Sequence, residues 1–325
     1  MSLNERKNME TSIEEPISQE PTTKKKKKTH GNNEASIGRW IAFFFILMFI
    51  YLFFGSIGVV IGKLTVVEGE LSWLPETLST FAGFAMMFFA SVFMLNKFMK
   101  TRFRDFVFGK GGSINFKTIG MILGCWILGI VISLVFDLVV GNTSSISVNP
   151  IGLKSILITL AMALVFTWMQ TSYEEIVFRG VFLRAACGNK IAPTAKCIIF
   201  GIISSAFFMM MHFANPEMIS QSNALDLVAA GFNYFLMGAI MYFANMAFGD
   251  LMPGMFIHWI NNFYGFAIIT EEVSAVQTGA IFFVSGSSSG VSSLLSILVT
   301  YAPIIILSIV YFIRRYKNKE TAPQA

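Results

Sequence analysis

WIAFFFILMFIYLFFGSIGVVI, residues 40–61, is an apolar run without a single charged side chain. A helix needs about 20 mostly apolar residues to cross the hydrocarbon core of a bilayer. The preceding residues 1–37 are polar, contain no apolar run and lack the pattern of a cleavable signal peptide. We therefore predict a disordered, polar and basic tail over residues 1–37, followed by a retained transmembrane helix.

The composition of the whole chain agrees with a membrane protein. Of the 325 residues, 54% are hydrophobic and only 13% are charged, and the mean hydropathy is +0.65. A soluble globular protein carries about 25% charged residues. A soluble core of this size could not bury so much apolar surface, so the composition excludes a single soluble domain.

Scanning the chain for apolar stretches of this length predicts an all-α, polytopic membrane helix bundle of about eight transmembrane helices. The eight predicted spans are Trp40–Ile61, Thr77–Leu95, Thr118–Val140, Ile156–Phe178, Ala195–Phe213, Leu225–Phe248, Leu251–Thr270 and Ser292–Ile313. We divide the chain into the tail 1–37, helices 1–3 over 38–154, a core of helices 4–7 over 155–270, and the last helix with a basic tail over 271–325.

The distribution of basic residues predicts the orientation. Lys and Arg gather in cytoplasmic loops. They are concentrated between the second and third spans and between the fourth and fifth: Lys97, Lys100, Arg102, Arg104, Lys110, Lys117, Arg179, Arg184, Lys190 and Lys196. The loops of the opposite side instead collect Glu68, Glu70, Glu217, Glu271 and Glu272. With eight spans, both termini lie in the cytoplasm, and we expect the plasma membrane of a bacterium.

The net charge of +5 also suits a membrane surface. The run Lys24–Lys28 lies in the polar tail, and four further basic residues over 314–319 follow the last span. Both positions suit contact with anionic lipid headgroups, and a plain solvated tail is the alternative. We therefore expect the lipid bilayer as a partner and no nucleic acid.

Two smaller features allow simple interpretations. Cys125, Cys187 and Cys197 lie in or beside apolar segments without a CxxC pair, so we interpret them as small buried residues, not as a disulfide framework or a metal site. The segment Arg102–Phe116 mixes basic and aromatic residues. It is either a short amphipathic piece along the inner membrane interface or an ordinary loop.

Two adjacent glutamates in the fourth predicted span are the first candidates for function. An ionisable side chain inside a span costs about 2.5 to 3.5 kcal/mol on insertion scales. Adjacent helical residues point about 100° apart, so Glu174 and Glu175 cannot serve one partner equally. Glu175 and Arg179 have the i,i+4 spacing of an ion pair, which leaves Glu174 facing elsewhere. A carboxylate in a low-dielectric site can act as a general base near neutral pH, although a purely structural ion pair also fits.

Two of the three histidines also lie in apolar segments. His212 follows Phe208 by one turn in the fifth predicted span. His258 and Asn262 share one face of the seventh, where their side chains could hold a substrate carbonyl and stabilise its oxyanion. A single histidine in a span is also compatible with packing alone, but Glu174, His212 and His258 lie on three spans that could converge on one cavity.

In this order the residues resemble the CPBP intramembrane proteases, which include the type II CAAX prenyl endopeptidases. Their pattern is Glu-Glu-x-x-x-Arg, then Phe-x-x-x-His, then His-x-x-x-Asn or Asp. Here these positions are Glu174, Glu175 and Arg179, then Phe208 and His212, then His258 and Asn262. The resemblance covers about residues 155–265. Each motif alone is weak, and the three in order are specific.

The resemblance implies that peptide bonds are hydrolysed inside the membrane. Glu174 and His212 would activate a water molecule, and His258 and Asn262 would hold the oxyanion. Glu175, Arg179 and Phe208 would support the site. The substrate would be a membrane-associated peptide or protein that enters a cytoplasm-facing cavity.

The sequence alone does not decide whether the reaction depends on a metal ion. A catalytic zinc ion usually has three protein ligands and one open position, and Glu174, His212 and His258 would be those ligands if zinc binds. The chain has no His-Glu-x-x-His motif. The similar CAAX endopeptidases favour a metal-free glutamate mechanism, so we expect no cofactor.

Two other classes of function compete with the protease. In a proton-coupled transporter, Glu174, Glu175 and the histidines would relay protons, but the paired broken helices of such proteins are not evident. In a non-catalytic scaffold or immunity protein, the same groove would bind a partner.

The protease interpretation has one geometric difficulty. At about 1.5 Å per residue, His212 lies about 25 Å along a helix that begins at Ala195, whereas Glu174 should lie nearer the cytoplasmic face. Either the fifth helix begins later, near Phe200, or the site lies deep in the membrane.

Overall fold

The structure is a computed structural model of the chain. It describes residues 35–65, 68, 71–109, 111–140, 145–150, 152–188, 191, 194–271, 273, 278–285 and 290–320. Almost all of the predicted tail, residues 1–37, lies outside the described residues. The predicted boundaries between the four parts of the chain stay predictions.

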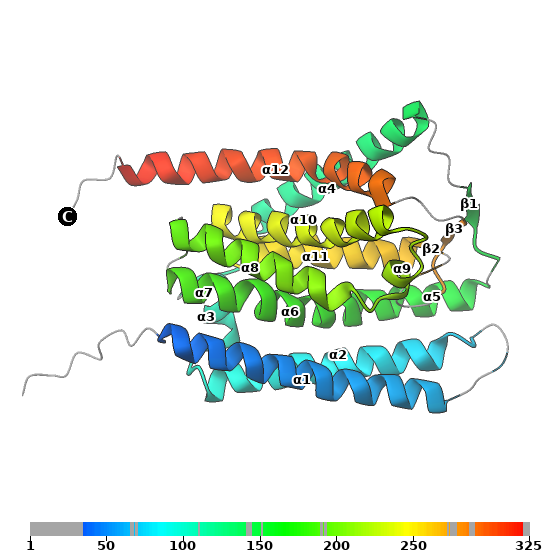
Figure 1. Cartoon of the computed structure of the whole chain (residues 1–325), viewed down its shortest axis with the longest axis horizontal. Coiled ribbons are helices and arrows are strands. Elements are labelled where there is room, and N and C mark those ends of the chain that lie inside the picture. The colour runs from blue at the N-terminus through cyan, green and yellow to red at the C-terminus, as the bar shows by residue number, and fades with distance from the viewer. Residues whose placement is uncertain are drawn as a thin grey trace, which may run out of the picture. The chain divides into compact units, whose positions relative to one another are not determined.

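The described residues form a bundle of helices, which confirms the prediction of an all-α polytopic fold (Figure 1). The α-helices are α1 (Ile37–Leu64), α2 (Leu74–Lys97), α3 (Phe103–Phe108), α4 (Phe116–Val140), α5 (Leu153–Met162), α6 (Trp168–Glu175), α7 (Val181–Cys187), α8 (Ala195–His212), α9 (Pro216–Ile219), α10 (Ala224–Phe248), α11 (Met252–Phe263) and α12 (Gly290–Glu320). Three π-helices accompany them: η1 (Ala163–Thr167), η2 (Ile176–Gly180) and η3 (Tyr264–Ile268).

Seven helices within the described residues, rather than the predicted eight, are long and apolar enough to cross a membrane. The difference is the seventh predicted span, Leu251–Thr270. Its residues form the 12-residue α11 and the five-residue η3, and then enter a strand. Pro253, Gly254 and His258 are buried on α11, so this segment is a short helix in the interior of the bundle. The sides of the membrane on which the termini lie stay a prediction.

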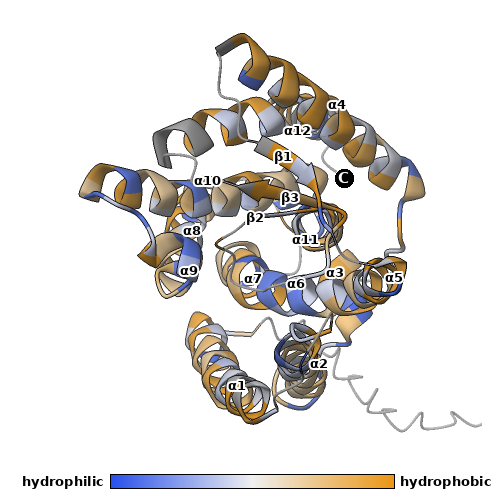
Figure 2. Cartoon of the chain, turned by 90° about the vertical axis from the view of Figure 1, so that its right-hand side faces the viewer, coloured by the Kyte–Doolittle hydropathy of each residue, from blue (hydrophilic) through white to orange (hydrophobic). Residues whose placement is uncertain are grey.

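The fourth predicted span is longer than expected. Residues Leu153–Cys187 form one 35-residue candidate span. The π-helices η1 and η2 lie within it, on either side of α6. A π-helix adds a residue to the turn and rotates the side chains that follow, and such segments are frequent at functional sites. Figure 2 shows polar residues on α6 in the interior of the bundle, between the α1–α2 hairpin and α11.

Local sequence explains where the helices of the core begin and end. The Thr194 side chain accepts a hydrogen bond from the backbone of Cys197 and caps the start of α8. Gly249 caps the C-terminal end of α10, and its φ of 92° is accessible to glycine without strain. Pro253 lies in the first turn of α11, where its missing N–H costs nothing.

Close packing of α8 and α10 brings two of the core helices together. A Cβ atom added at Gly238 would lie 3.1 Å from the Cα atom of Ser205 on α8. One at Gly201 would lie 2.9 Å from the Tyr242 ring on α10. Small residues at such contacts let helix backbones approach closely inside a membrane.

A small three-stranded sheet, which the sequence did not predict, lies at one end of the bundle. It consists of β1 (Ser145–Val148), β2 (Ile269–Glu271) and β3 (Phe282–Ser285), in the order β1-β3-β2. Strand β1 is antiparallel to β3, and β2 is parallel to it. Because β2 follows η3 directly, the sheet anchors the end of the short α11 segment.

The opposite end of the bundle contains α3, a short helix within the predicted segment Arg102–Phe116, and its apolar side packs against the protein. Phe106 and Val107 are buried in the protein, with 1% exposure each. The Phe106 ring fills the space beside Gly180, and the Val107 carbonyl accepts a hydrogen bond from the backbone N–H of Leu251 at 2.9 Å. Helix α3 is therefore part of the core.

The prediction for two of the cysteines is also wrong. Cys187 at the end of α7 and Cys197 in the first turn of α8 form a disulfide, with Cα atoms 6.7 Å apart. The two residues meet because the chain reverses direction between α7 and α8, which the spacing in the sequence did not indicate. Cys125 is a free, half-buried cysteine, as expected.

Candidate active site

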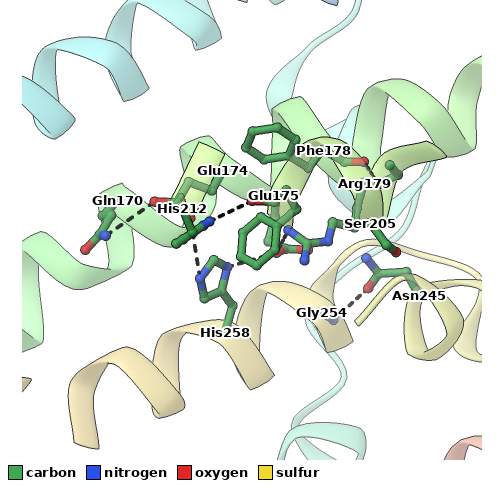
Figure 3. Close-up of polar contacts among 12 residues, drawn as sticks. Gln170, Glu174, Glu175, Phe178, Arg179, Ser205, His212, Asn245, Gly254 and His258 are labelled. Carbon is green, nitrogen blue, oxygen red and sulfur yellow. Dashed lines mark hydrogen bonds and ion pairs between the residues drawn. The ribbon is translucent and has the colours of Figure 1, made fainter. Parts of the chain in front are cut away.

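The centre of the bundle contains a buried network of charged side chains. Glu175 Oε1 lies 2.9 Å from Arg179 Nη1, which is the predicted i,i+4 ion pair. The same oxygen lies 2.9 Å from His258 Nδ1 on α11. Neither Glu175 nor Arg179 has any exposed surface, and His258 has 2%. Since a carboxylate only accepts, His258 Nδ1 carries the proton of that hydrogen bond. Figure 3 shows the network.

Glu174 points away from Arg179, as the helical spacing predicts. Its Oε1 accepts a hydrogen bond from Gln170 Nε2 at 3.3 Å. Its Oε2 lies 3.5 Å from His258 Nε2 and has no hydrogen-bond partner among the described residues. The side chain is nearly buried, with 6% exposure for the residue. His258 thus lies between the two glutamates, a position that the sequence did not predict.

Arg179 and the two histidines meet around one aromatic ring. The Arg179 guanidinium lies 4.0 Å from the centroid of the Phe208 ring. The rings of His212 and His258 lie 4.4 Å and 5.6 Å from it. Phe208 therefore joins α8 to the charged network on η2 and α11. Its physical role as the predicted supporting residue is this contact with the Arg179 guanidinium and the two histidine rings.

His212 is the last residue of α8 and is half-buried. Its Nδ1 lies 2.7 Å from the Phe208 carbonyl oxygen, one turn earlier. Since that oxygen only accepts, Nδ1 carries a proton. In a neutral imidazole this leaves the lone pair on Nε2, which is available to water or substrate.

The comparison with known protein families agrees with this geometry. Residues 154–264 match the family model described as type II CAAX prenyl endopeptidase Rce1-like. The centre of the chain is therefore similar to that family, and we call residues 154–264 the Rce1-like segment. The match confirms the resemblance predicted over about residues 155–265, and it includes all the residues of the charged network. Together with the seven apolar helices, it supports an integral membrane protein.

A curated relative covers a similar share of the chain. The "Uncharacterized protein YyaK" of Bacillus subtilis (strain 168) is 31% identical over 133 residues, which is 41% of this chain. The matched part spans 42% of the length of that relative. No solved structure matches the chain.

Within the Rce1-like segment, Asn262 is the predicted site residue that the structure does not join to the network. It lies one turn after His258 on α11 and is half-buried. Among the described residues its side chain has no hydrogen-bond partner. The neighbouring Asn261 instead accepts a hydrogen bond from Tyr301 on α12, at 2.8 Å.

Two residues of the Rce1-like segment contact the predicted site residues but were not predicted from the sequence. Gln170 lies one turn before Glu174, and this i,i+4 spacing in an apolar run could have revealed it. Tyr234 stacks on His212, with ring centroids 4.1 Å apart. It comes from α10, and no local pattern indicates that contact.

The geometric difficulty posed by His212 has a simple solution. Helix α8 does begin at Ala195 and has His212 as its last residue, so a later start near Phe200 is excluded. Glu174 also lies far from the end of its own helical segment, because that segment continues to Cys187 instead of ending near Phe178. The depth of the site in the membrane stays a prediction.

The three predicted zinc ligands, Glu174, His212 and His258, are not grouped as a metal site in this arrangement. His258 Nε2 lies 3.5 Å from Glu174 Oε2, while His258 Nδ1 is bound to Glu175. His212 Nδ1 is bound to the Phe208 carbonyl oxygen, which leaves only its Nε2 as a ligand. Within the described residues, no three His, Cys, Asp or Glu side chains are grouped as a metal site. We therefore assign no catalytic step to a metal.

Proposed function

We propose that this chain is an intramembrane endopeptidase that hydrolyses peptide bonds of membrane-associated peptides or proteins. The observation that carries the proposal is the Glu174 carboxylate. It is held in the middle of a 35-residue membrane-length helix, and its Oε2 has no hydrogen-bond partner among the described residues. A buried acceptor left unpaired is costly, so its retention favours a role in chemistry. The Rce1-like match supports the same class of enzyme.

In the proposed reaction Glu174 is the general base. Its Oε2 accepts a proton from a water molecule while the water oxygen bonds to the carbonyl carbon of the substrate. The carbonyl electron pair moves to the oxygen, which becomes an oxyanion. Collapse of this intermediate breaks the C–N bond, and the leaving amine takes the proton from Glu174.

Histidines and Asn262 complete the proposed mechanism. His212 Nε2 accepts a hydrogen bond from the same water and helps to orient it. Asn262 donates a side-chain N–H to the oxyanion, and His258 donates from Nε2 in its doubly protonated form, while its Nδ1–H stays bound to Glu175. Arg179 balances the charge of Glu175, which leaves the negative charge of Glu174 for the reaction.

The test is cleavage of membrane-derived peptides by the purified protein in detergent, with products identified by mass spectrometry. We expect the wild type to cleave and Glu174→Gln to lose at least about 10³-fold in rate, within the usual contribution of a general base. Glu76→Gln is the matched control, because Glu76 is an exposed carboxylate on α2. It should cleave like the wild type.

Other outcomes of the same assay would contradict the proposal. Equal cleavage by the wild type and Glu174→Gln would exclude Glu174 as the base. Loss of cleavage on adding a strong chelator, with recovery on adding zinc, would overturn the metal-free mechanism. Proton-coupled uptake of a solute that survives Glu174→Ala would favour a transporter. A partner-binding phenotype that survives both Glu174→Ala and His212→Ala would favour a scaffold.

A further inference from the structure

We infer that Tyr234 and Glu217 form a positioning pair that fixes the orientation of the His212 ring. This inference rests on the proposed function, in which His212 orients the attacking water. Neither residue belongs to the three motifs of the sequence, and neither would touch the substrate carbonyl. Their effect would pass through the His212 ring.

His212 needs support because of its place in the fold. It is the last residue of α8, and the helix gives way to turns at Phe213. Helix ends fray, and their final residues have fewer backbone hydrogen bonds to hold them. The bond from Nδ1 to the Phe208 carbonyl fixes one edge of the ring, but rotation about that contact would still move Nε2.

Tyr234 supplies the missing support from the neighbouring helix. Its ring lies on the His212 ring with an interplanar angle of 24° and a centroid distance of 4.1 Å. Phe208 contacts the His212 ring as well, at 4.4 Å and an angle of 53°. Two aromatic contacts and one hydrogen bond therefore restrain the orientation of the His212 ring.

Glu217 in turn fixes Tyr234. The Tyr234 hydroxyl donates a hydrogen bond to Glu217 Oε1 at 2.5 Å. Asn215 Nδ2 donates to the same oxygen at 2.8 Å. Gln221 Nε2 donates to the Glu217 carbonyl oxygen at 2.8 Å, which secures the short helix α9 on which Glu217 lies. The carboxylate therefore ties the turn after His212 to α10.

The close packing of α8 on α10 sets the distance that this stacking requires. Gly238 lies one turn from Tyr234 along α10, and its contact with Ser205 on α8 leaves no room for a side chain. From the contact between Gly238 and Ser205, the antiparallel helices α8 and α10 continue side by side to His212 and Tyr234. Tyr234 lies over His212 because the helix axes are held this close.

The first test measures kcat and KM in the cleavage assay. Tyr234→Leu removes the stacked ring, and we expect kcat to fall about 10- to 100-fold, the cost of misplacing a reacting group by about 1 Å. KM should change by less than about 3-fold, because the substrate contacts remain. Tyr234→Phe keeps the ring but loses the bond to Glu217, so its kcat should lie between those of Tyr234→Leu and the wild type.

Two variants at Glu217 distinguish the effect of its hydrogen bond to Tyr234 from the effect of its negative charge. Glu217→Gln keeps an acceptor for the Tyr234 hydroxyl and should leave kcat within about 3-fold of the wild type. Glu217→Ala removes the acceptor and should lower kcat as Tyr234→Phe does. If the two residues act as one unit, the effects of Tyr234→Phe and Glu217→Ala will not add in the double variant.

A second measurement does not depend on cleavage. The chain has only three histidines, so nitrogen NMR of histidine-labelled protein in lipid can be assigned with His30→Gln and His258→Gln variants. We expect His212 to carry its proton on Nδ1 in the wild type and in Tyr234→Phe. In Tyr234→Leu both tautomers should appear, because the ring is free to turn. Tyr242→Phe is the control, since Tyr242 is buried on the same helix and its hydroxyl has no partner among the described residues.

The outcomes separate this inference from the proposed function. If the wild type cleaves and Tyr234→Leu has the same kcat, the inference fails while the protease stands. A single His212 tautomer that is unchanged in Tyr234→Leu also overturns it. If the wild type cleaves no peptide but the tautomer responds to Tyr234→Leu, the positioning pair stands and the protease does not.

Discussion

Two buried arginines on the same membrane-length helix have opposite surroundings. Arg179 and Arg184 are 0% and 4% exposed. Each lies over a phenylalanine ring, Arg179 over Phe208 at 4.0 Å and Arg184 over Phe106 at 5.6 Å. The two side chains differ in their polar partners, and under the proposed function that difference separates a reactive cluster from a structural one.

The polar groups of the Arg184 cluster are paired with the backbone. Arg184 donates to the Phe106 carbonyl oxygen, and Asp250 accepts a hydrogen bond from the backbone N–H of Met252 at 2.9 Å. Arg315 donates to the carbonyl oxygens of Met246 and Ile191, at 3.2 Å and 2.8 Å. This cluster joins α3, α7, α12 and the turn between α10 and α11.

The Arg179 cluster is left incomplete. Within the described residues, Arg179 Nε, Glu174 Oε2 and Glu175 Oε2 have no hydrogen-bond partners. The cluster has two carboxylates for one arginine, whereas the other has two arginines for Asp250. An unsatisfied excess of acid destabilises the fold, and it is the arrangement that a general base requires. We therefore expect substitutions in the first cluster to change activity and those in the second to change stability.

The largest expected effect tests whether the Arg179 cluster contributes to activity rather than to stability. Glu174→Gln should abolish cleavage, by at least about 10³-fold, and leave the thermal midpoint in detergent unchanged or higher. The reason is that the amide keeps the shape of the side chain and removes an uncompensated buried charge. Rate and thermal midpoint are measured on the same preparation. A large fall in the midpoint would make Glu174 structural and break the comparison.

The next largest expected effect tests whether the Arg184 cluster contributes to stability rather than to activity. Arg184→Met keeps the length of the side chain but leaves the Phe106 carbonyl without its donor and Asp250 with one cation fewer. Breaking a buried pair typically costs about 3 kcal/mol, and we expect a loss of that size in the free energy of unfolding in mixed micelles. The kcat of the folded fraction should stay unchanged. A loss of kcat at full stability would assign Arg184 to the active site.

An intermediate effect is expected at Arg179 itself. Lysine keeps the charge but loses the planar guanidinium that stacks on Phe208 while it pairs with Glu175. A desolvated cation–π contact is worth about 2 kcal/mol, so Arg179→Lys should lower kcat/KM about 10- to 30-fold. Arg184→Lys is the matched control and should leave kcat/KM unchanged. Equal losses in the two variants would show that the arginines do not differ as proposed.

The sequence predicted the parts of this site that depend on helical spacing. The Glu175–Arg179 pair and the divergence of Glu174 follow from 3.6 residues per turn. The long apolar runs predicted the membrane bundle, and the three motifs predicted the Rce1-like segment. Relations within one helix are accessible to such reasoning because the helix fixes them locally.

The features that the sequence did not predict depend on contacts between distant segments or on small changes of helical geometry. The position of His258 between two glutamates depends on how α11 packs against α6. The π-helices η1 and η2 lie in sequences that read as ordinary helix. The stacking of Tyr234 on His212 and the disulfide of Cys187 with Cys197 join elements that only the tertiary fold brings together.

The smallest expected effect concerns Asp250, the acid of the structural cluster. Burial raises the pKa of Asp250 above its ordinary value, although the N–H of Met252 and the charges of Arg315 and Arg184 oppose this rise. A raised pKa means that the folded state binds the proton more tightly than the unfolded state. Stability should therefore fall as pH rises from the ordinary pKa of aspartate, about 3.9, through the raised value.

Asp250→Asn keeps an acceptor for Met252 and removes this titration, so its stability should depend less on pH over the same range. We expect the difference between the two proteins to be on the order of 1 kcal/mol or less, measured as thermal midpoints across that range in detergent. Glu76→Gln, at an exposed carboxylate, is the control and should follow the wild type. Parallel curves for wild type and Asp250→Asn would mean that the two arginines fully offset the burial of Asp250. The structural cluster would then be electrostatically balanced at every pH, and its contrast with the Arg179 cluster would be even greater.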